Sequence, residues 1–197
     1  DSMAAAPAYF AAAGGAAGFV NGWLTVRTGI NGFIVTLATA SAFAGINLGI
    51  TKAVPFYNLP ADFVAFGNGR VGLFPLLLIV PLLVTVVLAL FFARAVPGRH
   101  MLAVGGNAPA AQLSGVSVPR AIISAHVLSG LLAAVAGVLA VAQLGSAQPT
   151  IGSDWLLISF AAPIIGGASL AGGAISIVGT LLAVVLMIIW TLLRLVD

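Results

Sequence analysis

The sequence predicts an all-α integral membrane protein, a polytopic helical bundle with about six spans in this chain. Two observations lead to this class. Hydrophobic residues make up 61% of the 197 residues and charged residues only 6%, with no glutamate at all, whereas a soluble domain carries about a quarter charged residues. The apolar residues also gather into blocks of about the 20 residues that a helix needs to cross a bilayer. A surface this apolar is expected to face lipid.

Six apolar blocks are expected to form the spans, and they cover residues 3–26, 30–51, 72–93, 121–144, 155–172 and 174–194. The fifth block is the weakest, because Pro163 and the glycines of IIGGASLAGG interrupt it. We expect it to cross fully or to be a broken, re-entrant segment that packs among other helices. Residues 1–197 read as one transmembrane domain, and the apolar blocks at both ends suggest a fragment of a longer protein.

The loop over residues 94–120 indicates the orientation. It contains or borders four basic side chains and no acidic one: Arg94, Arg99, His100 and Arg120. Because basic loops of membrane proteins stay in the cytoplasm, we expect this loop to be cytoplasmic. The net charge of +3 rests on few residues, so it indicates orientation and not nucleic acid binding.

Small residues recur at helical spacing in several blocks. Helices in lipid associate where small residues let their backbones approach closely, although alanine- and glycine-rich helices also produce such pairs by chance. The second block has such a pair in Gly45 and Gly49. The glycines that we predict to pack helices together are Gly14, Gly18, Gly22, Gly166, Gly167, Gly172 and Gly173.

Polar side chains within the spans are the candidates for a translocation path, because polar groups at that depth are costly and frequently functional. These candidates are Asn21, Thr36, Asn47, His126, Gln143 and Ser159. Thr39 and Ser124 also lie within spans. The alternative for each is a hydrogen bond to a neighbouring helix, and for His126 this alternative is favoured.

The sequence gives little support for an enzyme that acts within the membrane. All four aspartates lie at the ends or in loops, which excludes an aspartyl intramembrane protease. A serine protease built on Ser169 and His126 would require a geometry that the sequence does not indicate. The zero cysteines exclude thiolate metal sites, and we expect no catalytic or metal-binding residue in this chain.

The source of energy is expected to lie in another subunit. The single lysine, Lys52 in GITKAVP, is not in a phosphate-binding loop. The spans also lack the acidic residues expected of an ion-coupled transporter. The short polar stretch GGNAPAAQLSGVSVPR, at residues 105–120, suits docking of a soluble partner.

This stretch resembles the cytoplasmic coupling loop of ABC importer permeases of the ribose, xylose and galactose type. That loop typically reads Gly-Gly-Asn, two residues, Ala, and then Ser/Ala-Gly-Ile/Val. The residues that match are Gly105, Gly106, Asn107, Ala110, Ser114, Gly115 and Val116, with Leu113 between them.

Three further stretches resemble the family in the same order: VNGWLTVRTGINGFIVTLAT, LSGLLAAVAGVLAVAQLGSAQPTIG, and IIGGASLAGG followed by VGTLLAVVLM. The chain departs from the pattern at four places. Asn31-Gly32 stands where proline is usual. The family commonly has an acidic residue just before the fifth block, and at that place this chain has only Asp154. Pro163 is unusual, and Ala174 and Ile175 stand where a basic residue is common.

The resemblance implies the membrane subunit of an ATP-driven importer that moves a monosaccharide or similar polyol across the bacterial inner membrane. It implies a second permease copy, a cytoplasmic ABC ATPase that binds the ATP, and a periplasmic sugar-binding protein, with no cofactor in this chain. The alternative is a passive pore or a structural membrane component without ATPase coupling, which the departures around the fifth block motivate.

Overall fold

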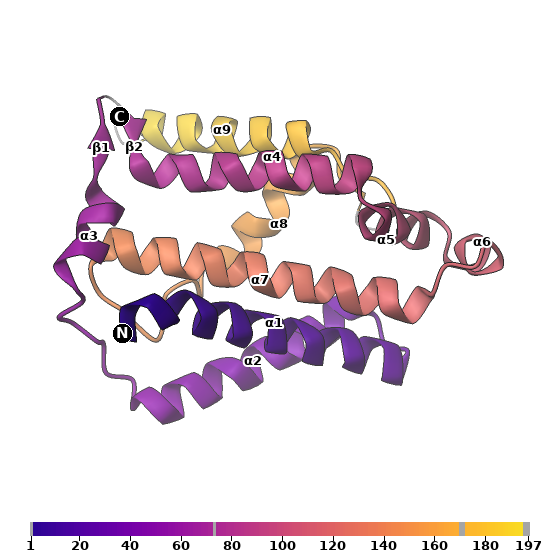
Figure 1. Cartoon of the computed structure of the whole chain (residues 1–197), viewed down its shortest axis with the longest axis horizontal. Coiled ribbons are helices and arrows are strands. Elements are labelled where there is room, and N and C mark those ends of the chain that lie inside the picture. The colour runs from indigo at the N-terminus through magenta and orange to yellow at the C-terminus, as the bar shows by residue number, and fades with distance from the viewer. Residues whose placement is uncertain (1, 73, 170–171, 195–197) are drawn as a thin grey trace. The chain divides into compact units, whose positions relative to one another are not determined.

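The structure is a computed structural model that describes residues 2–72, 74–169 and 172–194. It confirms the all-α class (Figure 1). The helices are α1 (Ser2–Thr28), α2 (Gly32–Thr51), α3 (Ala61–Asn68), α4 (Ile79–Arg94), α5 (Val96–Gly106), α6 (Ala108–Leu113), α7 (Val118–Leu144), α8 (Trp155–Ile165) and α9 (Ile177–Arg194). A short antiparallel hairpin, β1 (Arg70–Val71) and β2 (Phe74–Pro75), leads through the 3-10 turn η1 (Leu76–Leu78) into α4.

Contacts between residues divide the chain into two compact units. The first comprises Asp1–Val84 and Pro119–Ile151, and the second comprises Thr85–Val118 and Gly152–Asp197. The first unit therefore holds α1, α2, α3 and nearly all of α7, while the second holds the end of α4 together with α5, α6, α8 and α9. The prediction of a single transmembrane domain stays a prediction.

Three segments in the described part of the chain are helical, long and apolar enough to cross a bilayer. They are Gly32–Thr51, Leu76–Arg94 and Val118–Leu144, with mean hydropathies of 1.8, 3.0 and 2.2. At most 11% of each is buried inside the protein. Apolar helices that expose so much of their surface need lipid or other membrane helices around them, so the chain is a multi-pass membrane protein.

The fifth predicted block does not form one continuous spanning helix. Its helix α8 has 11 residues and ends at Ile165, which at 1.5 Å per residue is about 16 Å long, roughly half of the hydrocarbon core. Pro163 lies in the last turn of α8, and Gly167 follows with φ +88°. The broken alternative therefore describes this block, and the total of six spans stays a prediction.

Glycines of α1 bring its backbone against that of α7 in the first unit, where the two helices run side by side (Figure 1). A β-carbon added at Gly14 would collide with the carbonyl oxygen of Gly130, and one at Gly18 with that of His126. A β-carbon at Gly22 would lie 2.7 Å from the α-carbon of Ile123. The backbones touch here because none of these three residues has a side chain.

Helix α2 joins α1 by a side-chain hydrogen bond. The Thr39 hydroxyl donates to Asn21 Oδ1 at 2.6 Å. The α2 face that carries Gly45 and Gly49 is open in this unit, because a β-carbon added at either residue would meet nothing within 4 Å. Of the two glycine repeats, only the one on α1 makes a close contact within the described chain.

Candidate functional site

The segment around α6 in the second unit is a compact helix with a cap at each end. Asn107 ends α5, where its N–H donates to Ala103 O at 3.0 Å, and it also begins α6, where its Oδ1 accepts from Ala110 N at 3.0 Å. One residue thus joins both helices. At the other end, Val116 N donates to Ala111 O and Gly115 N donates to Gln112 O, each at 3.0 Å. These two bonds form the Schellman motif that commonly ends a helix.

Position 115 needs a glycine because of the backbone conformation of this turn, and not because another residue lies close to it. Its φ is +83°, a conformation that side chains disfavour, while a β-carbon added to it would meet nothing within 4 Å. A glycine can be required by a backbone turn or by a close neighbour, and at Gly115 the structure has the turn. Residues 107–116 therefore form a helix with both ends held by hydrogen bonds, and not an irregular connector.

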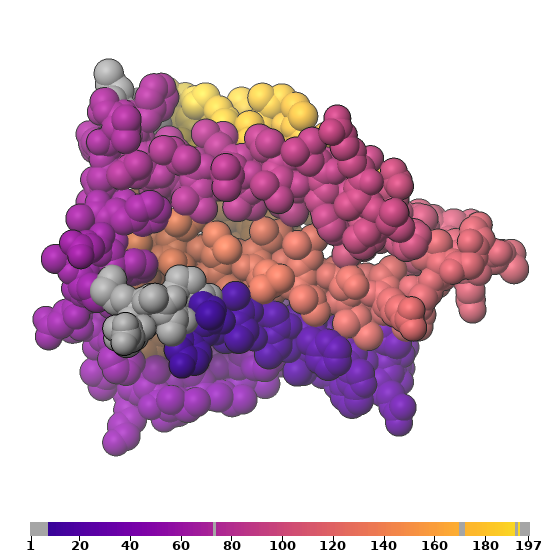
Figure 2. All heavy atoms as spheres, viewed as in Figure 1, coloured from indigo at the N-terminus to yellow at the C-terminus, as the bar shows by residue number. Residues whose placement is uncertain are grey.

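Leu113 is the side chain of α6 that stands out. It is 91% exposed, whereas Ala111 on the same helix is 5% exposed. In the space-filling view the segment stands clear of α9 and of the end of α4 in its own unit (Figure 2). Leu113 is the only large apolar residue in α6 (Ala108–Leu113), so the sequence alone shows that it is the one large apolar side chain of this helix. Only the structure shows that it points into the surroundings.

The predicted packing glycines of the second unit make two contacts. A β-carbon added at Gly166 would collide with Thr180 N of α9. Gly172 and Gly173 lie against Gly105, at the end of α5. Gly167 meets nothing within 4 Å and instead adopts a positive φ. The loop after α8 therefore touches the start of the predicted coupling loop.

The predicted path residues have different hydrogen-bond partners and fall in both units. Ser159 lies in the second unit, where its hydroxyl donates to Leu156 O of its own helix. In the first unit, Thr36 donates to Phe33 O, and Asn47 Nδ2 donates to Pro149 O at 3.0 Å. Gln143 is exposed at the end of α7. Asn21 bonds Thr39, which the sequence marked only as a polar residue within a span. Their assignment to a path stays a prediction.

His126 lies where α1, α2 and α7 meet. Its backbone carbonyl lies against Gly18, and its Cβ would be 3.2 Å from a β-carbon added at Gly22. Its ring Nε2 would be 3.2 Å from one added at Gly32, at the start of α2, and its Nδ1 is 3.0 Å from Ile122 O of its own helix. These contacts favour a role in helix packing.

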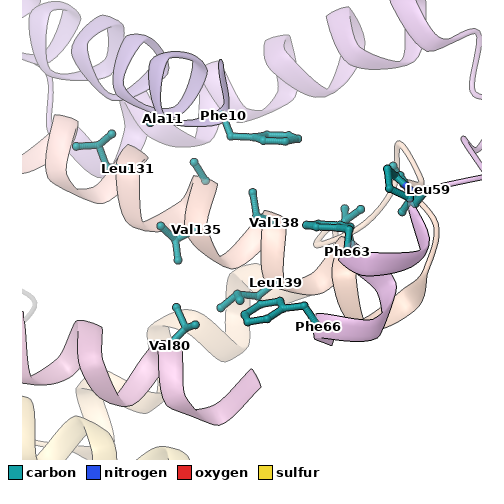
Figure 3. Close-up of a pocket in the computed structure, with 14 residues that line it drawn as sticks. Phe10, Ala11, Leu59, Phe63, Phe66, Val80, Leu131, Val135, Val138 and Leu139 are labelled. Atoms are coloured by element: carbon teal, nitrogen blue, oxygen red, sulfur yellow. The ribbon is translucent and has the colours of Figure 1, made fainter. Parts of the chain in front are cut away.

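The first unit also contains a pocket of about 590 Å³ (Figure 3). Phe10 of α1, Phe63 and Phe66 of α3, and Val135 and Leu139 of α7 are among its lining residues, all of which are apolar. None of the predicted path residues lines it. Sites for hydroxylated molecules need placed hydrogen-bonding groups, so this pocket is not suited to a sugar.

The predicted orientation can be tested with two cysteines, because the chain has none of its own. Gln112 in the α6 segment and Gln148 after α7 are both exposed, and one long helix, α7, separates them. We expect Gln112→Cys to react with an impermeant maleimide only from the cytoplasmic side, and Gln148→Cys only from the opposite side. Labelling of both from the same side would contradict a crossing by α7.

Comparison with known proteins gives the family. A family model described as "Branched-chain amino acid transport system / permease component" matches residues 2–195. The D-allose transport system permease protein of Escherichia coli is 39% identical over 160 residues, which are 81% of this chain and 49% of that protein. No solved structure matches the chain.

Two further relatives carry similar names. The ribose import permease protein of Bacillus subtilis is 39% identical over 168 residues, 84% of this chain and 52% of that protein. The autoinducer 2 import system permease protein of Yersinia pseudotuberculosis is 31% identical over 179 residues, 88% of this chain and 54% of that protein. The chain spans about half the length of the curated relatives it matches.

These matches confirm the resemblance that the coupling-loop residues and the three membrane stretches carried. They also agree with the long apolar helices, which are those of a membrane protein. The chain belongs to the family of transport-system permease components, and within it resembles the membrane permeases of sugar-type ABC importers.

Proposed function

We propose that the chain is part of the membrane subunit of an ATP-driven importer, which moves a monosaccharide or similar polyol across the bacterial inner membrane. Two permease copies form the pathway. A cytoplasmic ABC ATPase binds and hydrolyses the ATP, and a periplasmic sugar-binding protein delivers the solute. The names of the relatives, D-allose and ribose among them, support this class of solute.

The observation that carries the coupling to an ATPase is the exposed Leu113 on the doubly capped helix α6. The basic residues Arg94, Arg99 and His100, which precede α6, are all exposed, as expected of a cytoplasmic loop. A large apolar side chain that is 91% exposed on such a loop gains favourable free energy when a docking partner removes it from water. The caps hold α6 in one shape before a partner binds, which lowers the entropy lost on docking.

The proposed transport mechanism combines a rigid docking helix with a membrane bundle whose helices can pack in two ways. Closure of the ATPase dimer on ATP moves the α6 segments of the two permeases. The helices then change between outward-open and inward-open packings, a two-state equilibrium that both ATP and the solute bias. The solute is carried without chemical change.

The test is transport by purified components in proteoliposomes. We expect the permease, with its ATPase and binding protein, to accumulate a radiolabelled monosaccharide such as D-allose or ribose only when ATP is present on the ATPase side. An ATPase variant that binds but does not hydrolyse ATP serves as the control. Equilibration of the sugar by the permease alone would instead favour the passive pore.

A further inference from the structure

The end of α5 and the loop between α8 and α9 meet backbone to backbone in the second unit. A β-carbon added at Gly105 would lie 2.6 Å from Gly173 N, and one added at Gly172 would lie 2.9 Å from Gly105 O. One added at Gly173 would collide with the backbone of Gly106. The two backbones therefore touch, and a side chain at Gly105, Gly172 or Gly173 would force them apart. We call Gly105, Gly106, Gly172 and Gly173 the glycine joint.

On one side, the joint is directly connected to the docking helix. Gly105 and Gly106 are the last two residues of α5, and Asn107 follows at once. Asn107 donates its N–H to α5 and accepts through its side chain from α6. A displacement of α6 therefore reaches the joint through a residue that is hydrogen-bonded to both helices.

On the other side, the joint is connected to two helices that are held together. Gly172 N donates to Ser169 O, and Ser169 N donates to Ala174 O, both at 3.1 Å. Beyond this hydrogen-bonded loop, a β-carbon added at Gly179 of α9 would lie 2.9 Å from the carbonyl carbon of Gly166. Since the α8 and α9 backbones touch there, a displacement of Gly173 would act on both helices.

We propose that the glycine joint transmits movement of α6 to the α8–α9 pair, and that Gly105 is a positioning residue for this step. The inference rests on the proposed function, which assigns the movement of α6 to an ATPase. Backbone contacts suit such a role because they lack the rotamer freedom by which side chains absorb small displacements, and closely packed elements pass displacements on. The half-length helix α8 would then be moved from its loop end.

The experiment compares two neighbouring substitutions in the permease assembled with its ATPase and binding protein. In Gly105→Ala the new methyl group meets Gly173 N at 2.6 Å, whereas in Gly106→Ala it meets the Gly173 α-carbon at an ordinary 3.9 Å. Both substitutions lie in the last turn of α5 and improve its helix propensity by a similar amount. Only the fit of the joint differs between them.

We expect Gly105→Ala to import at least tenfold less sugar per ATP hydrolysed than the parent. Gly106→Ala should match the parent. This ratio does not depend on the amount of assembled protein, so a lower yield does not affect it. An unchanged ratio in Gly105→Ala, or an equal loss in Gly106→Ala, would overturn the inference while leaving the proposed function intact. A parent without ATP-driven uptake would overturn both.

A second pair of substitutions changes the joint from the loop between α8 and α9. It provides the test if Gly105→Ala fails to assemble. Gly172→Ala places a methyl group 2.9 Å from Gly105 O at a φ of +96°. Gly167→Ala carries the same backbone strain, at a φ of +88°, but meets nothing within 4 Å. We expect only Gly172→Ala to lower the sugar imported per ATP. Equal ratios in this pair would also overturn the inference.

Discussion

Replacing Gly18 with leucine is expected to prevent α1 from packing on α7 and to remove most of the folded permease. Gly18 is buried, and a β-carbon at this position would already collide with the carbonyl of His126. Overpacking of an ordinary core costs about 1–3 kcal/mol because side chains can rearrange. Here the opposing atoms belong to the backbone of α7, so a whole helix must shift. The measurement is the yield of monodisperse protein after extraction in mild detergent.

Gly45→Leu is the matched control for this prediction. It makes the same change in another apolar helix, but at a position where an added β-carbon meets nothing within 4 Å. We expect Gly45→Leu to keep a near-parental yield of the permease subunit. Equal yields of the two variants would contradict the α1–α7 contact and would indicate that the Gly18 face of α1 lies toward lipid.

The second large effect is expected at Leu113. Replacing it with serine should weaken ATPase binding by about ten- to a hundredfold, because burying a leucine contributes about 1.5–3 kcal/mol and each 1.4 kcal/mol is a factor of ten. The side chain is 91% exposed, so its loss removes little from the permease itself. The permease should therefore insert and fold normally. Binding of purified ATPase to permease in nanodiscs measures the effect.

Two further variants show whether Leu113 acts as an apolar anchor. Leu113→Met keeps an apolar side chain of similar volume and should bind the ATPase nearly as well as the parent. Gln112→Ser changes the exposed neighbour on the same helix and should also have little effect. ATPase binding by Leu113→Ser at the parental affinity would mean that α6 is a connector without a docking role.

The candidate site was only partly predictable from the sequence. The residues of the coupling loop could be named because they form one continuous stretch, and its two caps depend on short-range bonds of Asn107 and Gly115. The contact of Gly105 with Gly173 could not be predicted, because it joins residues that are far apart in the chain. Thr39 was similarly recognisable as a polar residue within a span, but not as the partner of Asn21.

The sequence by itself determined the class of the protein, since transfer into lipid is nearly a sum over residues and needs no knowledge of their neighbours. It also indicated where the fifth block could be interrupted, because Pro163 and the glycines after it act locally on the backbone, and the structure showed that α8 does end there. Only the tertiary structure decided which small-residue face is a contact. Gly18 and Gly45 lie in similar apolar helices with similar glycine repeats, yet one touches a carbonyl of α7 and the other meets nothing. The difference lies in the neighbouring helix, which composition and spacing do not encode.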